Sequence, residues 1–229
     1  MSHQAIKKSF ASKNLNFFFF SSLPGFPIME MLSMLFKFTF SQTNPDALTA
    51  CLEIWDDYLD QLAVLEESKV AVFLTKKSKP SIEFESLLVS LFNESLKKAQ
   101  FEHSSTLLSS LDNVTVEEDG ETERGSFIAA NIEIIAKICV LRPIDILGAL
   151  LPNLRAQIGA FLSGADKFTN FQILDLGTLL QIAGRLTEHF LGENFSKFLN
   201  DGQAVLISLL QLGGNLLEKL QDHPPRHTV

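Results

Sequence analysis

Apolar residues spaced by three and four positions constrain this chain most, because that spacing places their side chains on one face of a helix. Seven blocks with this spacing follow one another, separated by short segments rich in Gly, Pro, Asn, Asp or Ser, and no strand-like alternation competes with them. The expected helices cover 28–40, 45–62, 82–101, 127–141, 143–161, 171–191 and 195–220. The clearest stripe consists of Leu48, Cys51, Leu52, Trp55, Tyr58, Leu59 and Leu62. The sequence therefore predicts an all-α fold.

Several residues mark where these helices begin. Asn44 is expected to cap the second helix, with Pro45 at its first position, where a missing N–H costs nothing. Ser81 is expected to cap the helix that runs to residue 101. Pro143 ends one helix and starts the next, and Pro152 should bend the helix that contains it.

The spacing of the helix pairs, about forty residues, favours HEAT-like antiparallel helix pairs stacked as a short α-solenoid segment. An irregular bundle is the alternative, since both architectures use consecutive helices and short turns.

Composition divides the chain into a helical repeat region, 27–220, between two segments without helical pattern. Residues 1–26 are expected to be poorly ordered, and 221–229 to form a disordered tail. Within the repeat region, the serine-rich and acidic stretch 103–123 is longer than common connections and is expected to be a mobile loop.

Charge and cysteine content exclude several classes of protein. The formal net charge of −8 disfavours nucleic acid as a ligand, because phosphate binding requires clustered Lys and Arg. No stretch approaches the ~20 apolar residues of a membrane span, so membrane insertion is not expected. Cys51 and Cys139 lie at apolar positions of helical stripes, which predicts free buried thiols in a reducing compartment.

The sequence contains no pattern that predicts an enzyme, a cofactor site or a metal site. A nucleophile elbow, a phosphate-binding glycine loop and a CxxC pair are all missing from the 229 residues. His223 and His227 have metal-like spacing, but the two prolines between them prevent the helical face that such a pair needs. His189 is expected to be an ordinary surface or interface residue.

Two clusters of charged residues are candidates for protein docking. Glu53, Asp56, Asp57 and Asp60 gather on the side of their helix opposite Trp55, where they form an acidic face. This face could dock a basic partner, or it could simply be a solvated helix surface. The segment 76–79, Lys-Lys-Ser-Lys, matches a short nuclear localisation signal, although such tetrads are frequent by chance.

Three runs of residues resemble the exportin six family of nuclear export receptors, which is part of the importin-beta superfamily. They are MEMLSMLFKFTF from Met29, CLEIWDDYLDQL from Cys51, and DLGTLLQIAGRLTEHFLGENF from Asp175. Weaker similarity through IEIIAKICVLRPIDILGALLPNL joins them. The resemblance covers about 26–212, with breaks at 112–123 and 163–170, and residues 1–23 lie outside it.

The resemblance implies a HEAT-repeat receptor that binds cargo together with the GTP form of Ran and moves between nucleus and cytoplasm. Its expected partners are Ran-GTP, profilin-bound actin and nuclear pore proteins, and GTP hydrolysis would belong to Ran. The expected function is therefore protein binding within a partial nuclear export receptor. A small cytosolic helical scaffold or adaptor without Ran-dependent transport is the alternative.

The match covers only an interior part of such a receptor, so the chain is expected to be a fragment or shortened form. Neighbouring repeats stabilise one another, and terminal repeats normally carry polar caps. We therefore expect exposed apolar surface at both ends of the array, with self-association or poor solubility as the consequence.

Overall fold

The first two helices form an antiparallel pair whose junction follows from two residues. The computed structural model describes residues 27–67, 82–115, 120–164 and 169–186, with a few further positions between 200 and 214. Helix α3 (Ile28–Ser41) is followed by α4 (Pro45–Glu67). Asn44 Oδ1 accepts a hydrogen bond from the backbone N–H of Ala47 at 3.1 Å, and Pro45 occupies the first helical position. The predicted helix start is confirmed.

Trp55 of α4 joins this pair. Its side chain is fully buried, and its indole Nε1–H donates to Thr39 Oγ1 of α3 at 3.0 Å. The Thr39 hydroxyl in turn donates to the Leu35 carbonyl oxygen at 2.8 Å. A buried N–H without an acceptor costs about 1–3 kcal/mol, so Thr39 is what allows a tryptophan between the two helices. The other members of the predicted stripe are buried as well, except Leu62, which is half-buried.

Two predictions for residues 82–123 differ from the structure. Helix α6 (Ile82–Lys98) ends before Phe101, which begins a separate helix, α7 (Phe101–Ser110), so the single helix expected to run to residue 101 is wrong. The mobile loop expected over 103–123 is also wrong in its first part, since residues 103–110 are helical. Leu108 and Leu111 are buried and hold this stretch against the core. The prediction gave too much weight to the serine residues around them. The proposed cap Ser81 and residues 116–119 lie outside the described residues.

Three further helices follow up to residue 185, and each begins at a recognisable signal. Helix α8 (Glu123–Leu141) starts four residues earlier than expected, because the Thr122 hydroxyl accepts from the Gly125 N–H at 3.1 Å. Helix α9 (Pro143–Gly164) begins at its proline as predicted and continues through Pro152. Helix α10 (Asn170–Arg185) carries a capping box formed by Thr169 and Gln172. Residues 1–26, 187–199 and 215–229 lie outside the described residues, and so do the predictions for both ends of the chain.

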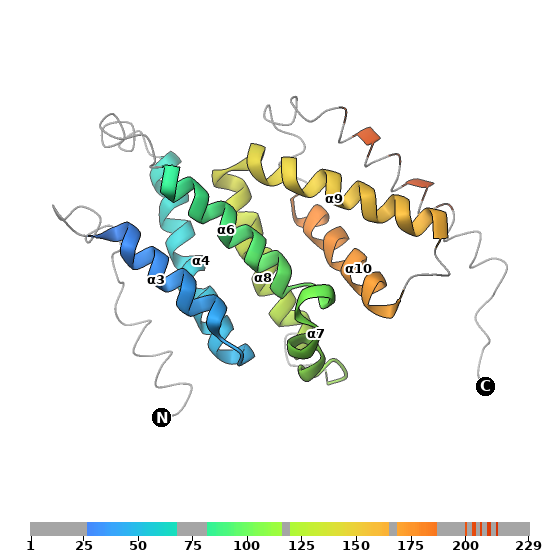
Figure 1. Ribbon diagram of the computed structural model, residues 1–229, viewed down its shortest axis with the longest axis horizontal. Helices are drawn as coiled ribbons and strands as arrows, with labels where there is room; N and C mark the ends of the chain where they lie inside the picture. Colours follow the sequence, from blue (N-terminus) through green and yellow to red (C-terminus); the bar gives the residue numbers. More distant parts are fainter. Residues whose placement is uncertain are drawn as a thin grey trace.

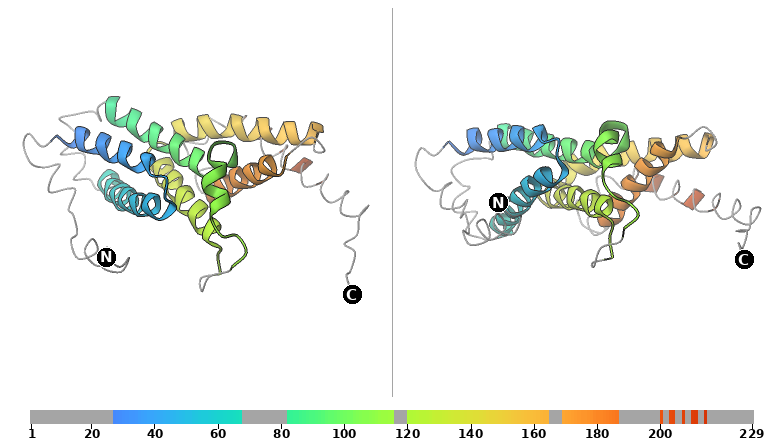
Figure 2. Two further views of the ribbon diagram at one scale, coloured as in Figure 1. Left: turned by 60° about the horizontal axis from the view of Figure 1, so that its bottom comes forward. Right: turned by 90° about the horizontal axis from the view of Figure 1, so that it is seen from below.

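The helices stack as pairs in two layers. Helices α3, α6 and α9 form one layer and α4, α8 and α10 form the other, as Figure 1 and both views of Figure 2 show. Each helix of the first layer is followed along the chain by its antiparallel partner in the second, and α7 is inserted between α6 and α8. The predicted all-α stack of antiparallel helix pairs is confirmed for the described residues.

The core lies between the two layers and runs the length of the stack. Helix α8 is central, and its buried side chains contact both layers; they include Ile132, Ile134, Ile135, Ile138 and Cys139. Cys51 and Cys139 are both buried free thiols, as predicted. Among the described helices, none is long and apolar enough to cross a membrane.

Candidate protein-binding surfaces

The acidic face predicted on α4 exists, but it also has an internal role. Glu53, Asp57 and Asp60 are exposed and Asp56 is half-buried, on the side of the helix away from Trp55. Lys137 of α8 reaches across to two of these carboxylates, with its Nζ 2.6 Å from Asp56 Oδ1 and 2.7 Å from Asp60 Oδ1. Half of the predicted docking face therefore helps to hold α4 against α8.

The surroundings of Lys137 explain why its charge is maintained. Burial alone would lower the pKa of this ammonium group. The hydrogen bonds that it donates to Asp56 and Asp60 more than offset that effect, and its pKa is raised above the ordinary value. The sequence pattern did not reveal this pairing, because Lys137 lies more than seventy residues further along the chain. A docking role for the acidic face stays a prediction.

Arginines at two helix ends connect helices in a similar way, both within a pair and between pairs. Arg142, which follows α8, pairs with Glu85 of α6 and, at 2.7 Å, with Asp145 of α9. Arg185 at the end of α10 binds Glu133 of α8 through two hydrogen bonds, of 2.8 and 3.1 Å. The hydrogen bond from Arg185 lowers the pKa of Glu133. Both cations therefore add ion pairs at the edges of the apolar core, where partial exposure keeps their contribution small.

A buried carboxylate holds the inserted helix α7 in place. Asp175 of α10 accepts hydrogen bonds from the backbone N–H groups of Phe101, at 2.5 Å, and Glu102, at 2.9 Å. These are free donors of the first turn of α7, so Asp175 caps a helix more than seventy residues away. Burial raises the pKa of Asp175, although the hydrogen bonds from Glu102 and Phe101 act to lower it. The Phe101 ring stacks on Phe171 with centroids 5.0 Å apart, and Arg124 lies 5.5 Å over the Phe101 ring.

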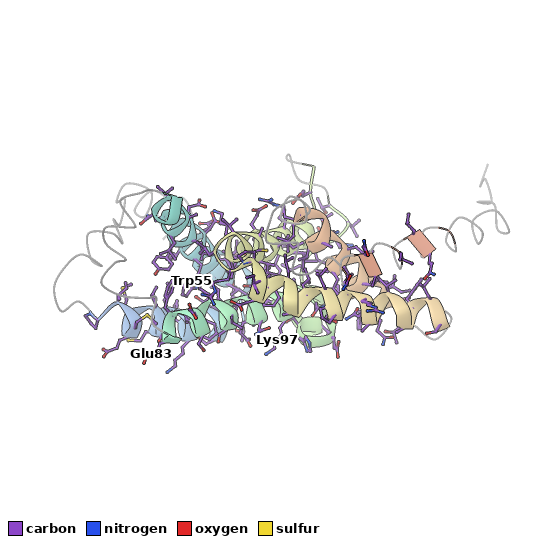
Figure 3. The ribbon with its side chains drawn as sticks, turned by 90° about the horizontal axis from the view of Figure 1, so that it is seen from above. Trp55, Glu83 and Lys97 are labelled. Atoms are coloured by element: carbon purple, nitrogen blue, oxygen red, sulfur yellow. The ribbon has the colours of Figure 1, made fainter. Side chains whose placement is uncertain are left out.

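The outer surface of α3 and α6 forms a groove of about 630 Å³ that sequence reasoning missed. Its apolar lining includes half-buried Met29 and Phe36, exposed Met34, and Leu87. Glu83 of α6 lies on its rim, at the outer edge of the layer and away from Trp55 (Figure 3). The groove could not be read from the sequence, because its two sides lie some fifty residues apart in the chain. We call it the outer groove.

The described residues contain no group of three or more His, Cys, Asp or Glu side chains that could hold a metal ion. His189, His223, His227 and the basic segment 76–79 lie outside the residues that the structure describes. The features that the described surface does offer are suited to protein contact: an acidic face, an apolar groove, and exposed apolar side chains on the end helices.

The amino-acid sequence is similar to a segment of several known proteins. The chain is 31% identical to Exportin-6 of Homo sapiens over 83% of this chain and 18% of that protein. Exportin-6-A of Xenopus laevis gives the same identity over 82% of this chain, and Exportin-6 of Dictyostelium discoideum gives 31% over 73%. The chain thus spans less than a fifth of the length of these relatives. No protein-family model matches the sequence, and no solved structure matches it.

Proposed function

We propose that this chain, which is homologous to a segment of the Exportin-6 proteins, is a non-enzymatic module that binds proteins during nuclear export. The observation that carries the proposal is the homology, which reaches relatives as distant as an amoeba and covers most of a stack of helix pairs. Such stacks present long rows of helices whose outer faces are available for partners.

The partners that we propose are Ran in its GTP form and profilin-bound actin, as the resemblance of the three sequence runs implies. Two features support protein binding by the described residues. The acidic face of α4 keeps Glu53 and Asp57 exposed, and the outer groove exposes Met34. A net charge of −8 suits a basic or neutral protein surface better than nucleic acid. Movement between nucleus and cytoplasm would follow from this role.

A pull-down with the purified full chain tests the proposal. Immobilised chain is incubated with profilin-bound actin, with Ran locked in its GTP form, and with both, at low and physiological salt. We expect cargo retention to rise when Ran-GTP is present and not when Ran-GDP replaces it. Cargo binding that is equally strong with Ran-GTP and with Ran-GDP would instead favour the alternative, a cytosolic scaffold without Ran-dependent transport. Retention of neither protein at either salt concentration would contradict an export role for this chain.

A further inference from the structure

The charged residues at the two ends of the outer groove have opposite signs. Helices α3 and α6 run side by side in the same direction (Figure 1), and the groove is lined from Met29 to Lys37 on α3 and from Glu83 to Ser90 on α6. Glu30 and Glu83 are first-turn residues of α3 and α6, so both lie at the end of the groove where the two helices begin. Lys37 lies at the other end. Within the described part of the chain, no ion pair involves these three side chains.

Between these charges the groove is lined by the apolar side chains of Met29, Met34, Phe36 and Leu87 and by three small polar residues, Ser33, Ser86 and Ser90. Met34 is 69% exposed, Met29 and Phe36 are half-buried, and Leu87 closes the groove between the two helices. Two parallel helices with an apolar valley between them accept a third helix, whose side chains at positions i, i+3, i+4 and i+7 fill the valley. Methionines adapt readily to the shape of such an occupant.

We propose that the outer groove binds an amphipathic helix of a partner protein, lying antiparallel to α3, with acidic residues in its first turn and basic residues in its last. The basic turn lies against Glu30 and Glu83, and the acidic turn lies against Lys37. This charge distribution is also the one that stabilises a helix against its own dipole, so the partner helix is preformed more readily than one with the opposite pattern. At 1.5 Å per residue, the nine residues from Met29 to Lys37 rise roughly 12 Å, which fits about two turns of a helix.

This inference goes beyond the proposed function, because it names a site and an occupant that do not depend on Ran or actin. Failure of the pull-down would leave it standing, and its own failure would leave the export proposal standing.

The test uses two labelled ten-residue model peptides, each held helical by a side-chain lactam bridge so that the first and last turns lie about 10 Å apart as in the groove, and fluorescence anisotropy with the full chain. Both peptides carry leucines at helical spacing and Glu in the first turn, and they differ only in the last turn, which is Lys in one and Glu in the other. We expect the Lys-ended peptide to bind the unmodified chain about tenfold more tightly, with a difference that shrinks as salt is added. In the Glu30→Lys, Glu83→Lys double variant the preference reverses. A Met34→Ser substitution weakens both peptides without unfolding the chain, since this side chain is already exposed.

The matched control is the Asp46→Lys, Glu102→Lys double variant. Both residues are exposed acids in the first turns of their helices, α4 and α7. Replacing them changes the net charge as much as the Glu30→Lys, Glu83→Lys variant does, and it places lysines at the same kind of helix position. Neither residue lines the outer groove. This variant should retain the preference for the Lys-ended peptide. A nitroxide at the carboxyl end of that peptide should broaden the amide signals near Glu30 and Glu83, which tests the antiparallel orientation.

Three results would overturn the proposal. One is an equal loss of peptide preference in the two double variants. Another is binding that appears only after removal of residues 1–26, which would make the chain's own segment the occupant. The third is a change in self-association, instead of peptide binding, when the groove residues are altered, which would make a second copy the occupant.

Discussion

At the level of single residues, long charged side chains connect one helix pair to the next around an apolar core. Lys137 shows the principle, because its ammonium group contacts two carboxylates that sequence reasoning had assigned to an outer face. Helical periodicity correctly predicted on which side of α4 these acids lie. It could not predict their partner, since periodicity describes one helix at a time and the pairing depends on how α4 and α8 meet.

Replacing Lys137 with methionine should lower the free energy of unfolding by about 1 kcal/mol, because Asp56 and Asp60 lose their shared cation. The effect is modest because Asp60 is largely exposed. The raised pKa of Lys137 sets the pH dependence: the stabilisation is complete below the ordinary value of 10.5 and is lost as the pH rises through the folded value. Urea unfolding of both proteins from pH 7 to 11.5 measures the difference.

Lys97→Met is the matched control. Lys97 forms an ion pair at 2.7 Å with Glu94 of its own helix, and its side chain is about half exposed. Its loss should change stability by less than about 0.5 kcal/mol. A difference between Lys137→Met and the unmodified chain that persists unchanged above pH 11 would contradict the role of the charge.

At the level of helices, the sequence predicted correctly those helix starts that are determined by residues adjacent in the chain. Asn44 with Pro45 and the proline at 143 each began a helix as predicted. The break between α6 and α7 was missed because residues 99 and 100 are neither glycine nor proline, and Phe101 continues the apolar spacing of α6. That break depends on Asp175, whose carboxylate supplies the cap from α10, a contact that no local pattern contains.

Asp175 therefore gives a prediction for the inserted helix. Asp175→Ala leaves the buried N–H of Phe101 and its neighbour at Glu102 without an acceptor, which should cost about 1–3 kcal/mol. Asp175→Asn retains one carbonyl oxygen and should cost less. Hydrogen exchange followed by mass spectrometry should show the loss of protection concentrated in α7. Protection in α7 that is unchanged by the alanine substitution would contradict this account of the break.

At the level of the whole molecule, apolar side chains are exposed on the first and the last helix pair of the described residues. On α3, Phe38 is 60% exposed, and on α10, Leu174 is 45% exposed. Exposed apolar surface at the ends of the array was an expectation from the sequence, because each repeat buries its apolar face against its neighbours. The sequence could not predict the outer groove, because a groove between α3 and α6 requires their relative placement in the first layer.

We expect these exposed apolar side chains to mediate self-association. The Phe38→Gln, Leu174→Gln double variant should therefore self-associate less, while its free energy of unfolding changes by no more than about 1 kcal/mol. Val140→Gln is the control, because Val140 is 47% exposed but belongs to the central pair. Sedimentation velocity over a range of concentrations compares the three proteins. Equal self-association of the end variant and the control would show that the end helices are not responsible.

The proposed binding of export partners by this stack of helix pairs is tested most directly by the affinity of labelled profilin-bound actin for the purified chain, measured by anisotropy with saturating Ran-GTP and with saturating Ran-GDP. We expect tighter cargo binding with the GTP form, and by linkage an equal factor in the affinity of Ran-GTP when cargo is present. Cargo affinity that is the same with both nucleotide forms would contradict this expectation.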